Sequence, residues 1–208
     1  MPLKPSARRF WKFAQKKWPS RPCTGTWLHP RKSRTLSLSV GEPELNCMPP
    51  KLLADLDSMD LTKICLTKEQ IYESLPHRFE FMLLDGIRHV DLEAKLIVAF
   101  RDVREDDWWF RGHVPGRPLL PGVLMLEMAA QVSAIMAKLV EGIDGFIAFG
   151  GIDKCKFRDV VTAPETLYLV SVGTEYRKRR VVSETQGIAN GKLVFQATIT
   201  GVILPESS

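Results

Sequence analysis

Residues 112–140 decide the fold, and they read GHVPGRPLLPGVLMLEMAAQVSAIMAKLV. The prolines and glycines of the first half forbid regular structure as far as Gly122, whereas the positions from Val123 to Val140 are almost all apolar or small. A helix that is apolar around its whole circumference is normally buried on all sides. We therefore predict a turn-rich loop that leads into a long central helix enclosed by the core.

Strand patterns lie on both sides of this helix, and they favour an antiparallel sheet. Runs of β-branched and apolar residues occupy 81–90, 95–103, 146–152, 166–177, 180–189 and 192–204. Asn190-Gly191 predicts a type I′ hairpin turn between the last two runs. Thr67 and Gln70 have the spacing of a capping box for a short helix that ends before Pro76. We predict an α+β fold in which the antiparallel sheet wraps around the long central helix.

Charge divides the chain into two unequal parts. Residues 1–34 contain ten Lys or Arg and no Asp or Glu, so the other 174 residues hold 19 basic and 24 acidic side chains, a net charge of −5. The overall charge of +5 therefore belongs to a tail, and nucleic acid is not an expected partner. We predict a basic, disordered extension over residues 1–58 and a single domain over residues 59–208.

The cysteines and the longest apolar stretch exclude several other classes of protein. The four cysteines fall at wide, irregular spacings, which are typical of neither a zinc site nor a disulfide framework. Residues 119–140 are interrupted by Pro121, Glu127, Gln131 and Lys138, whereas a membrane span needs about 20 apolar residues. We expect a cytoplasmic protein without stable membrane insertion, and we expect neither a metal nor a cofactor.

The same decisive segment holds candidates for acid–base chemistry on a carbonyl compound. Histidine ordinarily titrates near neutral pH, so His113 is a candidate proton acceptor. Glu127 lies on an otherwise apolar helix, where a carboxylate without a role would be costly, and Gln131 follows it by one turn on the same face. Backbone N–H groups at Gly122 and Val123, where the helix begins, are suited to bind a carbonyl oxygen.

Three ordered motifs between residues 66 and 204 carry a resemblance to a known family. They are LPHRFEFMLLD at residues 75–85, the segment at 113–131, and GIDKCKF at residues 151–157. Together they resemble the β-hydroxyacyl-acyl-carrier-protein dehydratases of FabZ type, which are members of the hotdog-fold superfamily. The resemblance implies a hotdog fold, a homodimer that acts alone or as a trimer of dimers, and acyl carrier protein as the partner that delivers the substrate.

The resemblance also implies a role for each candidate residue. His113 is the catalytic histidine and Glu127 the catalytic carboxylate, contributed by opposite protomers. The Gly122 amide, with Val123 beside it, holds the thioester carbonyl, His113 removes the C2 proton, and Glu127 protonates the departing 3-hydroxyl while Gln131 orients its carboxyl group. A route in which His113 moves both protons stays open. The implied reaction converts a (3R)-hydroxyacyl-carrier protein to the trans-2-enoyl product in fatty acid biosynthesis.

Two competing functions share the fold. A hotdog thioesterase would use Glu127 alone to place water against the carbonyl carbon, and a non-catalytic acyl-binding protein would retain only the pocket. The fourteen-residue step from His113 to Glu127, with a Pro-Gly pair between them, favours dehydration. His77 and Arg78, which follow Pro76 in the first motif, are expected to fix the turn into the first strand, and His77 is not expected to take part in catalysis.

Departures from the family pattern affect the substrate more than the reaction. Val114 stands where the family commonly has Phe, which leaves the preferred acyl chain length open. Because acyl carrier proteins are acidic, docking requires a local basic patch. The candidate patches are the run at 177–180 and a second set formed by Lys154, Lys156 and Arg158.

Overall fold

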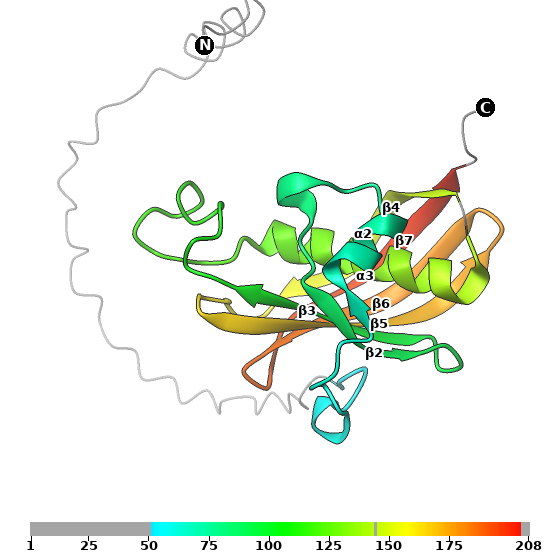
Figure 1. The fold of residues 1–208 in the computed structure, drawn as a ribbon, viewed down its shortest axis with the longest axis horizontal. Coiled ribbons are helices and arrows are strands. Elements are labelled where there is room, and N and C mark those ends of the chain that lie inside the picture. Colours follow the sequence, from blue (N-terminus) through cyan, green and yellow to red (C-terminus); the bar gives the residue numbers. More distant parts are fainter. Residues whose placement is uncertain (1–50, 144, 205–208) are drawn as a thin grey trace, which may run out of the picture. The chain divides into compact units, whose positions relative to one another are not determined.

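The fold consists of a seven-stranded antiparallel sheet crossed on one face by the long helix α3 (Gly122–Glu141), as Figure 1 shows. This computed structural model describes residues 51–143 and 145–204. The strands are β1 (Leu66–Thr67), β2 (Gly86–Asp91), β3 (Leu96–Val103), β4 (Phe146–Phe157), β5 (Glu165–Arg177), β6 (Arg180–Ala189) and β7 (Lys192–Leu204). Their order across the sheet is β1-β2-β3-β5-β6-β7-β4. The predicted α+β fold, an antiparallel sheet with a long central helix, is confirmed.

Local sequence signals act where they were expected, with one exception. Thr67 caps α2 (Lys68–Ser74) in a reciprocal capping box with Gln70. Asn190 and Gly191 have φ angles of 47° and 69°, the left-handed values that a type I′ turn requires. The predicted strand at 81–90 is wrong in its first half: Phe79–Phe81 forms the 3-10 helix η2, and β2 begins only at Gly86.

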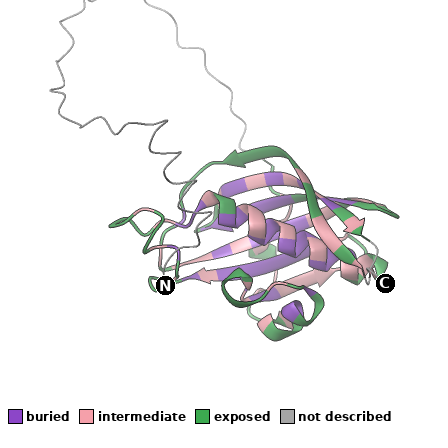
Figure 2. Ribbon diagram, turned by 90° about the horizontal axis from the view of Figure 1, so that it is seen from above, coloured by how far each residue is buried: buried purple, intermediate pink, exposed green. Residues whose placement is uncertain are grey.

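The core lies between α3 and the sheet. Met128, Val132 and Met136 of α3 are fully buried, and the helix packs against β3, β5, β6 and β7. Figure 2 shows buried residues along α3 and on the strands that it crosses. Burying one such side chain contributes about 1.5–3 kcal/mol. Among the described helices, α3 is the one long and apolar enough to cross a membrane by composition, and its place in the core accounts for that composition.

The expectation that α3 is buried on all sides is wrong. A stripe along one face remains partly open, because Val123 is 68% exposed and the residues that follow it along this face are incompletely buried. These residues are Glu127, Ala130, Ala134 and Lys138. Since they recur every three or four residues, they lie on the same face of the helix. The sheet of one protomer therefore does not enclose this face.

A segment before β1 covers the opposite face of the sheet. Leu53, Leu56 and Met59 pack against a second apolar cluster centred on Val98. The side-chain amide of Gln186 donates to the backbone oxygen of Lys51 at 3.0 Å and accepts from the Leu53 N–H at 2.9 Å. The packed part of the domain therefore begins before residue 59, where the boundary was predicted. Composition alone indicated disorder for this segment, but the hydrogen bonds to Gln186 of β6 hold it against the sheet. The disorder predicted for residues 1–50 lies outside the described residues.

Candidate active site

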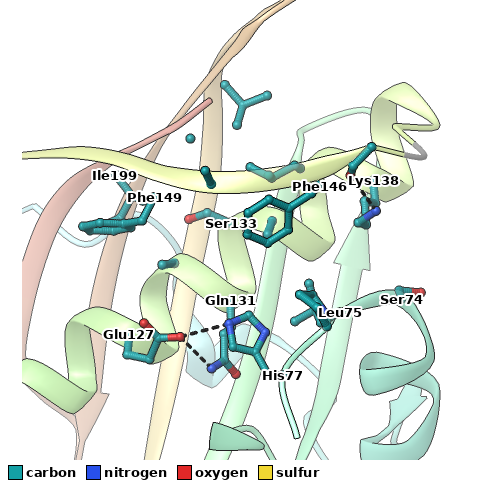
Figure 3. Close-up of a pocket in the computed structure, with 18 of the residues that line it drawn as sticks. Ser74, Leu75, His77, Glu127, Gln131, Ser133, Lys138, Phe146, Phe149 and Ile199 are labelled. Carbon is teal, nitrogen blue, oxygen red and sulfur yellow. Dashed lines mark hydrogen bonds and ion pairs between the residues drawn. The ribbon is translucent and has the colours of Figure 1, made fainter. Parts of the chain in front are cut away.

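A pocket of about 440 Å³ opens between α3, the loop that follows α2, and β4 (Figure 3). Its walls are mainly apolar, and polar side chains converge at one end, as is usual for sites that bind small organic groups. The lining residues used below are Leu75, Pro76 and His77 of the loop, Glu127, Gln131 and Lys138 of α3, and Phe146 and Phe149 of β4. The open stripe of α3 is therefore one wall of the pocket.

Glu127 is held at the polar end by two hydrogen-bonding side chains. Its Oε1 accepts a hydrogen bond from Gln131 Nε2 at 2.9 Å and lies 3.2 Å from His77 Nε2, and Figure 3 marks both contacts. The hydrogen bond from His77 lowers the pKa of Glu127 below its ordinary value, with a smaller effect in the same direction from Gln131, whereas burial opposes them. In this arrangement Glu127 is ionised at neutral pH.

Gln131 is fixed by a chain of buried hydrogen bonds. Its Nε2 also donates to the Phe81 carbonyl at 3.0 Å, and its Oε1 accepts from the Tyr72 hydroxyl at 2.7 Å. The Tyr72 hydroxyl in turn accepts from the Leu84 N–H at 2.8 Å. Because Tyr72 occupies the oxygen of the Gln131 amide, the nitrogen is the end that faces Glu127. The structure thus brings Glu127 and Gln131 together in the way that their spacing predicted.

The other predicted site residues lie outside this pocket in a single protomer. His113 is exposed on the loop before α3, where its backbone N–H donates to the Trp109 carbonyl at 2.8 Å, and its side chain is not among the pocket-lining residues. Gly122 and Val123 form the first turn of α3, and no side chain caps this helix end. A Cβ on Gly122 would lie 2.9 Å from the ring of Phe157 in β4, so a larger residue here would have to displace this ring.

Of the two residues expected to fix the turn after Pro76, Arg78 does so, whereas the His77 ring contacts Glu127. The guanidinium of Arg78 donates to the carbonyls of Leu75 and His77 at 2.7 Å each. The His77 ring takes no part in these two hydrogen bonds and lies against Glu127. The sequence did not indicate a role for Tyr72, because a single tyrosine on the apolar face of a short helix is typical of an ordinary core residue.

Comparison with known proteins assigns the chain to a family. The FabA-like domain model matches residues 75–198. The chain belongs to the FabA-like family. This FabA-like protein is 39% identical over 139 residues to the 3-hydroxyacyl-[acyl-carrier-protein] dehydratase FabZ of Enterococcus faecalis, a match that covers 66% of this chain and 98% of the relative. It is 37% identical over 138 residues to the same-named enzyme of Bacillus velezensis, which covers 65% and 96% of the two chains. The resemblance to FabZ-type dehydratases is confirmed.

Solved structures show the hotdog fold of this FabA-like protein. The dehydratase heterocomplex ApeI:P from Xenorhabdus doucetiae aligns with a TM-score of 0.55 at 17% identity, over 65% of this chain and 91% of that chain. A mutant of thioesterase PA1618 from Pseudomonas aeruginosa aligns with a TM-score of 0.53 at 15% identity, over 70% and 99% of the two chains. Because structures titled dehydratase and thioesterase both share the fold, the fold alone does not separate these two reactions.

Proposed function

We propose that the protein is a hydro-lyase that removes water from a (3R)-hydroxyacyl group carried by acyl carrier protein, in the cytoplasmic synthesis of fatty acids. The observation that carries the proposal is the placement of Glu127. A carboxylate oriented by Gln131 stands at the polar end of an apolar pocket, within a segment that matches the FabA-like family and FabZ relatives along nearly their whole length. Such a pocket suits an acyl chain with its reacting carbons beside Glu127.

The second half of the proposal is a homodimer that completes the site. In the described chain β4 pairs with β7 on one side only, and it exposes Phe146, Phe149, Ile152 and Phe157 by 49%, 50%, 38% and 50%. An edge strand of this kind, with large apolar side chains, is a template for pairing with another strand. The open face of α3 lies beside it. Pairing of β4 with its copy would cover both.

A two-fold axis through β4 would bring His113 to Glu127. Within one protomer, Phe157 at the end of β4 packs against Gly122, directly after the loop that carries His113. Phe146 and Phe149, at the beginning of β4, line the Glu127 pocket. Antiparallel pairing sets the end of one strand against the beginning of its copy. The His113 loop of each protomer would then enter the Glu127 pocket of the other.

In the proposed reaction His113 removes the C2 proton, and the C3–O bond breaks as the C2–C3 double bond forms. Charge that develops on the thioester oxygen is stabilised by the N–H groups of Gly122 and Val123 at the start of α3. The leaving hydroxyl takes a proton and departs as water. That proton comes from Glu127, or from His113 after it has taken the C2 proton.

The lowered pKa of Glu127 bears on the choice between these two routes. While His77 holds the carboxylate ionised, Glu127 orients the hydroxyl and His113 moves both protons. If the substrate hydroxyl replaces His77, the main cause of the lowered pKa is removed while burial still acts to raise it, which favours the protonated carboxyl group that the route through Glu127 needs. The alkaline limb of the pH–rate profile separates the routes, because only the route with Glu127 as the acid requires its carboxyl group to be protonated in the complex, so that turnover falls as the pH rises through the pKa of Glu127.

The test is incubation with 3-hydroxyacyl-carrier proteins of several chain lengths, followed by mass detection of the product. We expect loss of water with the thioester retained. His113→Ala and Glu127→Gln should each reduce turnover by about 10²-fold or more, the usual scale for loss of a general acid or base. Release of a free acid would instead identify a thioesterase. Wild-type turnover in a folded Glu127→Gln variant would contradict the mechanism.

A further inference from the structure

A cluster of buried charges lies outside the pocket, at the end of β3. The side chains of Arg101, Asp85 and Asp107 are 7%, 10% and 8% exposed. Arg101 Nη1 lies 3.2 Å from Asp85 Oδ1, and Arg101 Nη2 pairs with Asp107 Oδ1. Taking such charges out of water costs several kcal/mol per ion unless their geometry is very good. The proposed reaction uses none of these groups, so the cluster needs another explanation.

Two members of the cluster belong to the rigid part of the fold. Arg101 lies on β3, and Asp85 comes directly before β2. Asp85 Oδ2 accepts from the Asp102 N–H at 3.0 Å, and its carboxylate also pairs with Lys68 of α2 at 3.5 Å. Asp85 is thus held by α2 and β3, and it holds one edge of the Arg101 guanidinium in turn.

The third member belongs to the loop that carries His113. Asp107 binds Nη2 of Arg101 through its Oδ1. The Oδ2 of Asp107 accepts a hydrogen bond from the Arg104 N–H at 2.9 Å, which closes a turn of the loop. Trp109, which is 3% exposed, lies with its ring centroid 5.3 Å from the Arg101 guanidinium carbon. The Trp109 carbonyl accepts the His113 N–H at 2.8 Å. A continuous path of contacts therefore runs from Arg101 to the backbone of His113.

We propose that Arg101 and Asp107 form a positioning pair that sets the His113 loop in the shape in which it enters the partner's pocket. The inference rests on the proposed function, because it concerns the histidine half of a site shared by two protomers. Apolar packing of Trp109 keeps the loop against the domain but does not fix its direction. The planar guanidinium of Arg101 fixes the direction of the loop, because Asp85 and Asp107 bind two of its edges and both contacts have preferred directions.

The first test is turnover of purified dimers that carry Asp107→Asn or Arg101→Lys. Asp107→Asn keeps the size of the side chain and an acceptor for the Arg104 N–H, but removes the charge that binds Arg101. Arg101→Lys keeps the charge but cannot bind Asp85 and Asp107 through a planar fork. We expect kcat to fall about 10- to 100-fold, the scale for residues that orient a functional group, while KM changes less than about threefold.

The matched control is Asp106→Asn, which makes the same change of charge on an exposed neighbour in the same loop. It should retain wild-type kcat and KM. Circular dichroism and size-exclusion chromatography should show folded dimers for all variants. Wild-type kcat in either Asp107→Asn or Arg101→Lys would overturn the inference.

Subunit mixing separates a positioning role from general damage. A protomer with Asp107→Asn should supply an intact Glu127 pocket but a misplaced His113. Mixed with Glu127→Gln protein, it should restore activity to about a quarter of the wild-type level after random exchange, since half of the dimers are mixed and each holds one intact site. Mixed with His113→Ala protein, it should restore none.

Mixing His113→Ala with Glu127→Gln protein comes first, because it tests the shared site itself. If this pair fails to restore activity in confirmed mixed dimers, the proposed dimeric site is wrong whatever Asp107 does. If it succeeds, and Asp107→Asn then fails to rescue Glu127→Gln or does rescue His113→Ala, the positioning role of the Arg101–Asp107 pair is wrong.

Discussion

Tyr72→Phe removes a single oxygen atom from the core and breaks two buried hydrogen bonds. The hydroxyl donates to Gln131 Oε1 at 2.7 Å and accepts from the Leu84 N–H at 2.8 Å. Gln131 is 1% exposed and Leu84 is fully buried, so neither partner can turn to water instead. Burial raises the pKa of Tyr72 well above its ordinary value, so the hydroxyl is a donor at every pH at which the enzyme is assayed.

The expected loss of stability follows from these two partners. Leaving one buried polar group unsatisfied costs about 1–3 kcal/mol, so two should lower the free energy of unfolding by about 2–6 kcal/mol. For a domain of this size that corresponds to a fall in Tm of roughly 4–24 °C. The Gln131 amide also loses the contact that fixes its orientation towards Glu127. Turnover should therefore fall about 10-fold at a temperature where the variant is fully folded.

Tyr176→Phe is the matched control. The Tyr176 hydroxyl is also buried, but it has no hydrogen-bond partner in the described part of the chain, and burial raises the pKa of this residue to about 12. Removing it should change stability by less than about 0.5 kcal/mol or increase it slightly. Urea denaturation measures the free energy of unfolding of both variants, and an unchanged m-value shows that the two can be compared with wild type. Equal stability of the two variants, or full turnover in Tyr72→Phe, would refute the role given to the Tyr72–Gln131 contact.

Three further predictions follow from the loop after α2, the segment before β1 and the β5–β6 turn. His77→Ala should raise the pKa of Glu127 towards its ordinary value of 4.5. Because a lowered pKa stabilises the fold above the unfolded-state value and this contribution is lost as the pH falls through the folded-state value, the variant should lose more stability relative to wild type near pH 7 than near pH 3. A urea-midpoint difference of the same size at both pH values would contradict this. A chain that begins at Met48 should unfold like the full chain, whereas one that begins at Met59 loses both Gln186 hydrogen bonds and the packing of Leu53 and Leu56, and should be about 2–4 kcal/mol less stable. Equal thermal unfolding of the two chains would show that the segment contributes nothing. Reversal of Arg179 and Arg180 to Glu should raise KM for carrier-bound substrate, more strongly at low salt, while a short pantetheine thioester is turned over as before. An equal effect on both substrates would mean damage to the site rather than to docking.

Much of the fold could be predicted from the sequence, because its signals are local. The apolar run from Val123 to Val140, the glycine and proline punctuation before it and the Asn190-Gly191 turn act through backbone dihedrals and side-chain periodicity within a few residues. The pairing of Glu127 with Gln131 belongs to the same class, since a helix places residues four apart on one face. The three sequence motifs, which occur in the same order as in FabZ-type dehydratases, then indicated the family.

The contacts that define the site were decided only by the tertiary structure. Gln131 meets Tyr72 across 59 residues of sequence, Arg101 meets Asp85 across 16, and Gln186 meets Lys51 across 135. No spacing rule links such pairs, because hydrogen-bond distance and direction depend on how separate elements approach one another. The same reason explains why His77 was expected to fix a turn. Its role depends on α3 bringing the Glu127 carboxylate within 3.2 Å of its ring, and that approach arises only when helix, loop and sheet have packed together.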